Sequence, residues 1–189
     1  MLHTIFSLMR CTLRQSGLIS LLGLFWMLGA CSPTLNWRDV EIDPQTRAQF
    51  PCRPEHAERP LVLAGVPVRA EMRACEAGGL SWSATVLDVG DPTRLTAVLR
   101  ESRLSLATRL QGREESVLPA QINGMTPNEE ARRVVIVGKT GEGRPARAEA
   151  VFVVRGLQVF QFVVMAQRGA PVQWAESADE FLRSVRWPG

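Results

Sequence analysis

Residues 66–86 have the sequence VPVRAEMRACEAGGLSWSATV, and a pair of antiparallel strands accounts for its pattern. Apolar and polar side chains alternate along residues 66–75 and again along residues 80–86. A period of two indicates a strand with one face on a core, and Gly78 and Gly79 between the two segments are typical of a tight turn. We therefore expect a β-hairpin here.

Further strands are expected on both sides of this hairpin, at residues 37–42, 48–52, 58–65, 117–122, 132–140, 148–155 and 157–167. Asp91 as N-cap and Pro92 as first helical residue predict a helix that ends at Gly112. A capping box from Ser177 to Glu180 predicts a second, short helix. Since no alternating strand-helix-strand units occur, the expected class is α+β, with a mainly antiparallel sheet packed by one long central helix and a short C-terminal helix.

An export signal precedes these elements. Arg10 and Arg14 come before the apolar run of residues 17–28, which is shorter than the roughly 20 residues that a membrane-spanning helix needs. A start at Met9 rather than Met1 would give the signal a compact basic beginning. We expect residues 1–30 to be a signal peptide.

The end of this signal, Leu28-Gly29-Ala30-Cys31, resembles the bacterial lipobox, in which a signal peptidase cuts before a cysteine that becomes acylated. Gly29 departs from the commonest pattern, where Ala or Ser stands. Ser32 in place of Asp is similar to lipoproteins that are sent to the outer membrane. The resemblance implies lipidation at Cys31 and a location on the periplasmic face of the outer membrane, and an ordinary signal peptide or short anchor is the alternative.

Residues 31–36 then form a short lipidated lead, and residues 37–189 form one globular α+β domain. The composition, with 46% hydrophobic and 22% charged residues, is typical of a globular chain. Loss of Arg10 and Arg14 with the signal lowers the net charge from +3 to +1. Because nucleic-acid binding needs clustered basic residues, we expect no nucleic-acid partner. The expected partners are the membrane, through the lipid on Cys31, and an envelope protein or glycan.

Export leaves Cys52 and Cys75 as a pair in an oxidising compartment. A disulfide between them closes a loop of about 24 residues and contributes about 3 kcal/mol in the chain-entropy model. Buried free thiols and a redox-active pair are the alternatives, the latter without a Cys-x-x-Cys spacing. Cys75 lies on the polar register of its strand, so a bulge, a sheet edge or a covering segment is needed to explain the bridge.

Catalytic motifs are not evident in the sequence. His56 is the only histidine after the signal, Ser81 and Ser83 belong to a strand pattern, and no Gly-x-Ser-x-Gly elbow occurs. With two His and four Cys in the whole chain, no metal or cofactor site is expected. We expect no catalytic residues, and the arginines near the end of the central helix are interpreted as a solvated face: Arg100, Arg103, Arg109 and Arg113.

Several segments resemble a group of proteobacterial envelope lipoproteins to which no activity is assigned: residues 31–38, 50–54, 75–79 and 180–182. The resemblance spans nearly the whole mature chain and implies lipidation at Cys31 and a paired Cys52 and Cys75. The order of strands and helices is also similar to the PsbP-like α/β sandwich, a likeness of topology alone. The favoured hypothesis is a non-catalytic binding or envelope-accessory module. The alternative is an envelope enzyme with a site in the cleft between sheet and central helix, using His56 or an arginine of that helix.

Overall fold

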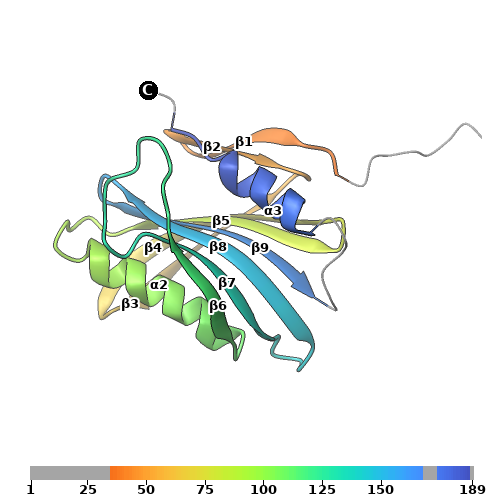
Figure 1. The fold of residues 1–189 in the computed structure, drawn as a ribbon. Helices are drawn as coiled ribbons and strands as arrows, with labels where there is room; N and C mark the ends of the chain where they lie inside the picture. The colour runs from red at the N-terminus through yellow and green to blue at the C-terminus, as the bar shows by residue number, and fades with distance from the viewer. Residues whose placement is uncertain (1–34, 168–173, 188–189) are drawn as a thin grey trace, which may run out of the picture. The chain divides into compact units, whose positions relative to one another are not determined.

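The computed structural model describes residues 35–167 and 174–187 (Figure 1). The strands are β1 (Arg38–Asp43), β2 (Thr46–Phe50), β3 (Glu55–Leu63), β4 (Val66–Ala77), β5 (Leu80–Asp88), β6 (Arg113–Pro119), β7 (Arg132–Lys139), β8 (Pro145–Arg155) and β9 (Gln158–Gln167). The helices in this part of the chain are α2 (Leu95–Arg109) and α3 (Trp174–Arg183). The signal peptide and Cys31 lie outside the described residues.

Seven of the strands form one antiparallel sheet in the order β3-β4-β5-β9-β8-β7-β6, and β1 and β2 pair separately. Helix α2 lies on one face of the large sheet, while α3 and the β1-β2 hairpin lie on the other (Figure 1). The expected α+β class with a mainly antiparallel sheet is therefore confirmed.

Both faces of the sheet are covered, so the domain has two hydrophobic cores. The α3-side core is built around the aromatic rings of Phe50, Trp82, Phe162 and Phe181, with Phe181 meeting the other three edge to face. The α2-side core consists of buried side chains of α2 and of the sheet face beneath it: Val98, Leu99, Leu87, Val134, Ile136, Phe152, Val154 and Val159, among others. Successive residues of a strand therefore serve different cores.

Helix α2 is shorter than the sequence predicted, and it is not central. It has 15 residues, from Leu95 to Arg109, instead of running from Pro92 to Gly112. Asp91 closes a turn before the helix, because its carboxylate accepts hydrogen bonds from the backbone N–H and the hydroxyl of Thr93 at 2.8 and 2.7 Å. At the other end the backbone leaves the helical region at Gln111, where φ is 44°.

Helix α3 begins earlier than the predicted capping box. The helix includes Trp174, so Ser177 is a buried residue inside the helix rather than its N-cap. Trp174, Ala178 and Phe181 are all buried in the α3-side core. Their spacing of four and three residues continues the apolar stripe one turn ahead of the box, and burial of that stripe explains why residues 174–176 are helical.

Cys52 and Cys75 form a disulfide, with their Cα atoms 6.1 Å apart. The register of β4 against β5 is continuous and pairs Cys75 with Trp82, so no bulge turns the cysteine. Cys75 instead packs against the α3-side core, and Cys52, two residues after the end of β2, packs against the same core. The register that looked polar in the sequence is thus partly covered by the β1-β2 hairpin.

Strand β3 is an edge strand of the large sheet, a position in which proline is tolerated. It spans residues 55–63 and contains Pro60, which pairs with Arg69 of β4. The other edge strand, β6, spans Arg113–Pro119. It begins four residues before the strand predicted at residues 117–122. These two edges frame the face that α2 covers.

Candidate functional site

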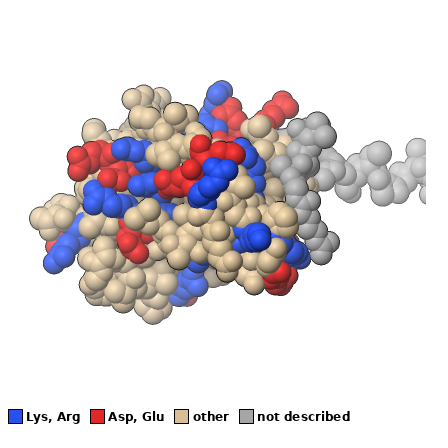
Figure 2. Space-filling view, turned by 60° about the horizontal axis from the view of Figure 1, so that its bottom comes forward, with Lys and Arg blue, Asp and Glu red and all other residues tan. Residues whose placement is uncertain are grey.

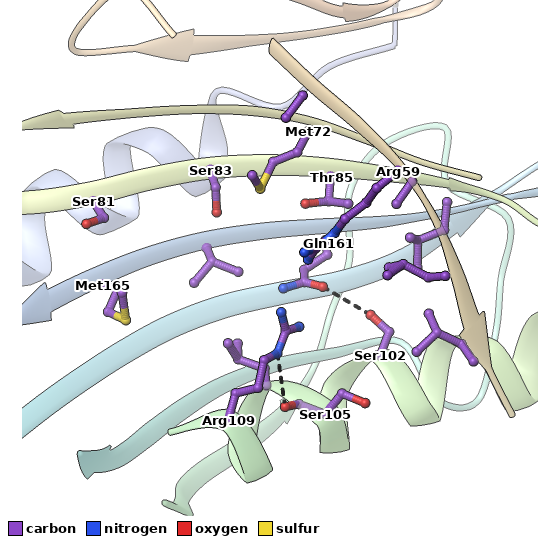
Figure 3. Close-up of a pocket in the computed structure, with 17 residues that line it drawn as sticks. Arg59, Met72, Ser81, Ser83, Thr85, Ser102, Ser105, Arg109, Gln161 and Met165 are labelled. Atoms are coloured by element: carbon purple, nitrogen blue, oxygen red, sulfur yellow. Dashed lines mark hydrogen bonds between the residues drawn. The ribbon is translucent and has the colours of Figure 1, made fainter. Parts of the chain in front are cut away.

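A cavity of about 250 Å³ lies between α2 and the half of the sheet formed by β3, β4, β5 and β9 (Figure 3). We call it the α2 cavity. Its apolar lining consists of Ala57, Leu61, Leu63, Ala70, Met72, Leu87, Leu106, Val163 and Met165. Its polar lining consists of Arg59, Ser81, Ser83, Thr85, Ser102, Ser105, Arg109 and Gln161.

The cavity exists because small polar residues stand where the rest of the layer is filled with large apolar ones. Beneath α2 on β8, Phe152 and Val154 are fully buried and fill the space. On β5 the same face carries Ser81, Ser83 and Thr85, whose side chains are too short to reach the helix. Helix α2 therefore packs tightly on the sheet over β8, and a cavity remains between the helix and β5.

Gln161 stands on β9 directly opposite Thr85, in the middle of this hollow. The Ser102 hydroxyl, on α2, donates a hydrogen bond to its side-chain oxygen at 3.2 Å. Ser102 is 2% exposed, so this contact joins the helix to the floor of the cavity inside the protein. With its oxygen engaged, Gln161 has its amide N–H groups left as donors.

Arg59 and Arg109 approach the cavity from opposite walls, and both guanidinium groups point toward Gln161 (Figure 3). Arg59 comes from the edge strand β3, and Arg109 is the last residue of α2. The Nε of Arg109 donates to the Ser105 carbonyl oxygen at 3.3 Å. Burial, followed by the positive charge of Arg59, lowers the pKa of Arg109 from its ordinary value. In the described part of the chain neither arginine is in an ion pair.

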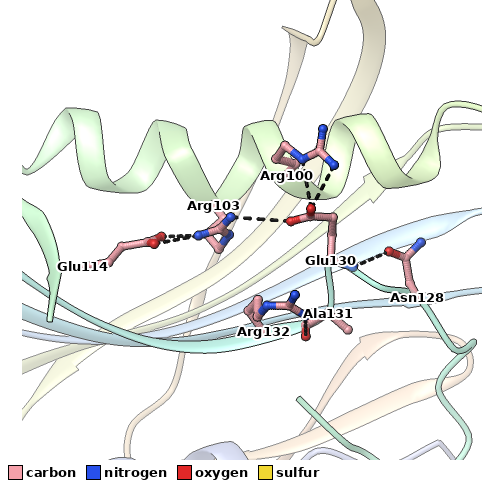
Figure 4. Close-up of polar contacts among 7 residues, drawn as sticks. All are labelled: Arg100, Arg103, Glu114, Asn128, Glu130, Ala131 and Arg132. Carbon is pink, nitrogen blue, oxygen red and sulfur yellow. Dashed lines mark hydrogen bonds and ion pairs between the residues drawn. The ribbon is translucent and has the colours of Figure 1, made fainter. Parts of the chain in front are cut away.

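Two other arginines of α2 have a different environment (Figure 4). Nη1 of Arg103 lies 2.6 and 2.7 Å from the two carboxylate oxygens of Glu114 on β6. Nη2 of Arg100 lies 2.9 Å from Glu130, in the segment before β7. The side chain of Arg103 is only 13% exposed, so the prediction of a fully solvated face is wrong at this residue. These pairs fasten α2 to β6 and to the segment before β7, and their charges are neutralised within the protein.

The polar groups of the cavity are mainly hydrogen-bond donors. Among the described residues that line it, none is Asp, Glu, His or Cys. Guanidinium and amide N–H groups can hold an anion or a carbonyl oxygen, and the serine and threonine hydroxyls can donate as well. No side chain in this lining is suited to take a proton from a hydroxyl at neutral pH. The arrangement fits binding rather than acid–base chemistry.

The residues that the sequence singled out lie elsewhere. His56 pairs with Arg73, while its neighbour Ala57 faces the cavity, so His56 is on the opposite face of β3. The disulfide of Cys52 and Cys75 is likewise on the α3 side. Of the residues considered for a cleft enzyme, the structure brings only Arg109 to the cavity.

Apart from Arg109, the cavity residues could not be recognised as a site from the sequence. The Ser-x-Ser-x-Thr pattern of residues 81–85 was visible, but a polar strand face is normally a solvated one. Only the position of α2 over that face turns these hydroxyls into a lining. Arg59 gave no signal at all, since it lies in a charged stretch of the edge strand.

No family model, curated protein or solved structure matches the chain. Within residues 35–167 and 174–187, no three or more His, Cys, Asp or Glu side chains are grouped so that they could hold a metal ion. The helices of this part of the chain are also too short or too polar to cross a membrane. On the face shown in Figure 2, acidic and basic side chains are intermingled rather than separated into patches of one sign.

Proposed function

We propose that the chain is a lipid-anchored module of the bacterial envelope that binds a small molecule in the α2 cavity and catalyses no reaction. The observation that carries the proposal is the pair of guanidinium groups, of Arg59 and Arg109, that point into a preformed cavity without an ion-pair partner in the described residues. Both residues are also exposed to solvent, and since neighbouring like charges contribute nothing to the stability of a fold, a bound anion accounts for the arrangement.

The envelope location rests on the sequence around Cys31. Leu28-Gly29-Ala30-Cys31 supports cleavage before the cysteine and its acylation, and Ser32 supports transfer to the periplasmic face of the outer membrane. The disulfide between Cys52 and Cys75 agrees with an oxidising compartment, because such bridges persist mainly outside the cytosol. Several acyl chains hold a protein at a bilayer stably without further lipid contacts.

The anchoring is tested by the intact mass of the protein purified from the membrane fraction of its host without reductant, after alkylation of free thiols. We expect the mass of residues 31–189 plus acyl chains, with no alkylation at Cys52 or Cys75. The matched control is Cys31→Ser, which should keep the signal and carry no acyl mass. A wild-type protein that retains its signal, or that lacks acyl mass, contradicts the proposal.

Binding in the cavity is tested by native mass spectrometry of the same preparation. Wild type should carry a small molecule that Ser83→Phe excludes, because Ser83 lies in the cavity and a phenyl ring there fills it. Ser83→Ala keeps the space open and should retain the molecule. Ala57→Trp, at an exposed lining position on the edge strand, gives a second way to block the cavity if Ser83→Phe does not fold. Identical spectra for wild type and both blocked variants reject the binding function.

A further inference from the structure

The charge in the α2 cavity has a single sign. Arg59 and Arg109 are its charged residues, and the lining contributes no carboxylate to balance them. On the same helix, Arg100 and Arg103 are each paired with glutamate at hydrogen-bond distance. The positive charges of the cavity are thus not balanced by a carboxylate in its lining, whereas those of Arg100 and Arg103 are balanced by glutamates.

The polar atoms around the two guanidinium groups add to this preference. Gln161 lies between them in Figure 3, and its oxygen is already used by Ser102, so its amide N–H groups face the space as donors. Thr85 pairs with Gln161 in the strand register and also lines the cavity. A planar anion with two oxygens can accept from a guanidinium fork and from such neighbours at the same time.

The remainder of the cavity is apolar. Leu61, Leu63, Leu106 and Val163 line it together with the flexible side chains of Met72 and Met165. The volume of about 250 Å³ equals that of about eight water molecules at ~30 Å³ each. It is smaller than the ~300–1,000 Å³ of typical small-molecule pockets, so the occupant has few heavy atoms.

We propose that the α2 cavity binds a small carboxylate with a compact apolar body, whose carboxylate lies between Arg59 and Arg109 and whose body packs on the leucine and methionine side chains. The inference rests on the proposed binding function and names the class of its ligand. Inorganic phosphate, which has no apolar body and is strongly hydrated, fits the charge of the cavity but not its leucine and methionine lining.

Methionine methyl groups provide a direct test. After the predicted cleavage the chain has three methionines: Met72 and Met165 line the cavity, and Met125 packs against the α3-side core. The purified lipoprotein, labelled with carbon-13 at its methionine methyls, is titrated with hexanoate, hexanamide, hexylammonium and inorganic phosphate. Hexanoate should shift the Met72 and Met165 signals and leave Met125 unchanged, while the other three probes should bind at least about tenfold more weakly.

Variants of the two arginines complete the test. Arg59→Gln and Arg109→Gln should each weaken hexanoate binding by about tenfold or more, because each removes a charge-assisted contact. Arg53→Gln changes an exposed arginine outside the cavity and should leave the affinity unchanged.

Two results would overturn the inference. Equal shifts with hexanamide and hexanoate would show a cavity that binds apolar molecules without regard to charge, in which case the binding function stands and the ligand class is wrong. No shift of Met72 or Met165 with hexanoate would also reject the carboxylate. The binding function itself is decided separately, by the molecule that Ser83→Phe excludes.

Discussion

Gly138 of β7 lies against Gly112, just after α2, so closely that a Cβ atom added to Gly138 would be 2.6 Å from the Gly112 Cα. The added atom would also meet the carbonyl oxygen of Leu110, which accepts a hydrogen bond from the N–H of Lys139 at 2.6 Å. The Gly-Lys-Thr segment at residues 138–140 therefore has a structural role, since it holds the end of the helix to the sheet.

Gly138→Ala should lower the free energy of unfolding by about 1–3 kcal/mol, the usual cost of forcing extra atoms into a packed site. The contacts are backbone atoms, which cannot turn aside as a flexible side chain would. Urea denaturation of both proteins measures the difference. Gly141→Ala is the matched control, because an added Cβ there meets nothing within 4 Å, and it should have little effect. Equal losses for the two variants would contradict this role of Gly138.

The disulfide should also be a measurable part of the stability. Cys52 and Cys75 are 23 residues apart, and a crosslink of that length stabilises by about 3 kcal/mol through the entropy of the unfolded chain. The double variant Cys52→Ala/Cys75→Ala should lose about this amount in urea denaturation. A reductant should lower the free energy of unfolding of wild type to a similar value. It should leave the free energy of unfolding of the double variant unchanged. A double variant as stable as the oxidised wild type would assign the bridge no stabilising role.

The sequence predicted the strands well where alternation was regular. Residues 66–86 form β4 and β5, as predicted, and the turn lies at Gly78 and Gly79, both of which have positive φ. The ends of α2 were predicted wrongly from the sequence. Asp91 can cap a helix, but in the structure its carboxylate closes a turn before the helix. Which segments cover each face of the sheet could not be predicted, since this depends on where parts of the chain that are distant in sequence pack.

For the same reason the lining of the cavity was not predicted, although the alternative hypothesis placed a site between the sheet and α2. Ser83 and Thr85 have the pattern of a solvated strand face, and Arg109 has that of a favourable charge at a helix end. Each residue has an ordinary local explanation. Their meeting in one hollow follows from the placement of α2 across β9, which no spacing in the chain encodes.

Glu130 should make the stability depend on acid pH. Hydrogen bonding to Arg100 is the main cause that lowers the pKa of this carboxyl, and the charges of Arg100 and Arg103 act in the same direction. A carboxyl with a lowered pKa stabilises the fold while it is ionised, above the pKa of the unfolded chain. That contribution is lost as the pH falls through the pKa of the folded state.

The expected difference between wild type and Glu130→Gln is therefore largest at neutral pH and shrinks as the pH drops below about 4.3. Urea denaturation across a pH series measures it. Glu55→Gln serves for comparison, because Glu55 is exposed and has no ion-pair partner in the described residues. A wild-type advantage over Glu130→Gln that stays constant down to pH 3 would rule out the ionised pair as its source.

Replacing the charge of Arg109 should raise the stability, whereas replacing that of Glu130 lowers it. Burial of part of the Arg109 side chain and the nearby charge of Arg59 lower its pKa, so the folded state disfavours the charged form; because Arg109 is also exposed to solvent, the effect on stability is small. A neutral side chain of similar length removes both penalties and keeps the apolar contacts of the stem. Arg109→Met should therefore raise the melting temperature in the absence of ligand, although it loses the hydrogen bond to the Ser105 carbonyl oxygen.

Arg100→Met is the matched comparison on the same helix, and it should lower the melting temperature because it leaves Glu130 with one partner fewer. Thermal unfolding followed by circular dichroism measures both variants. Opposite signs at the two positions are the signature of a binding site, where charge is kept for a ligand at the expense of the fold. If Arg109→Met destabilises the protein as much as Arg100→Met does, Arg109 is a structural residue, and its charge needs no ligand to explain it.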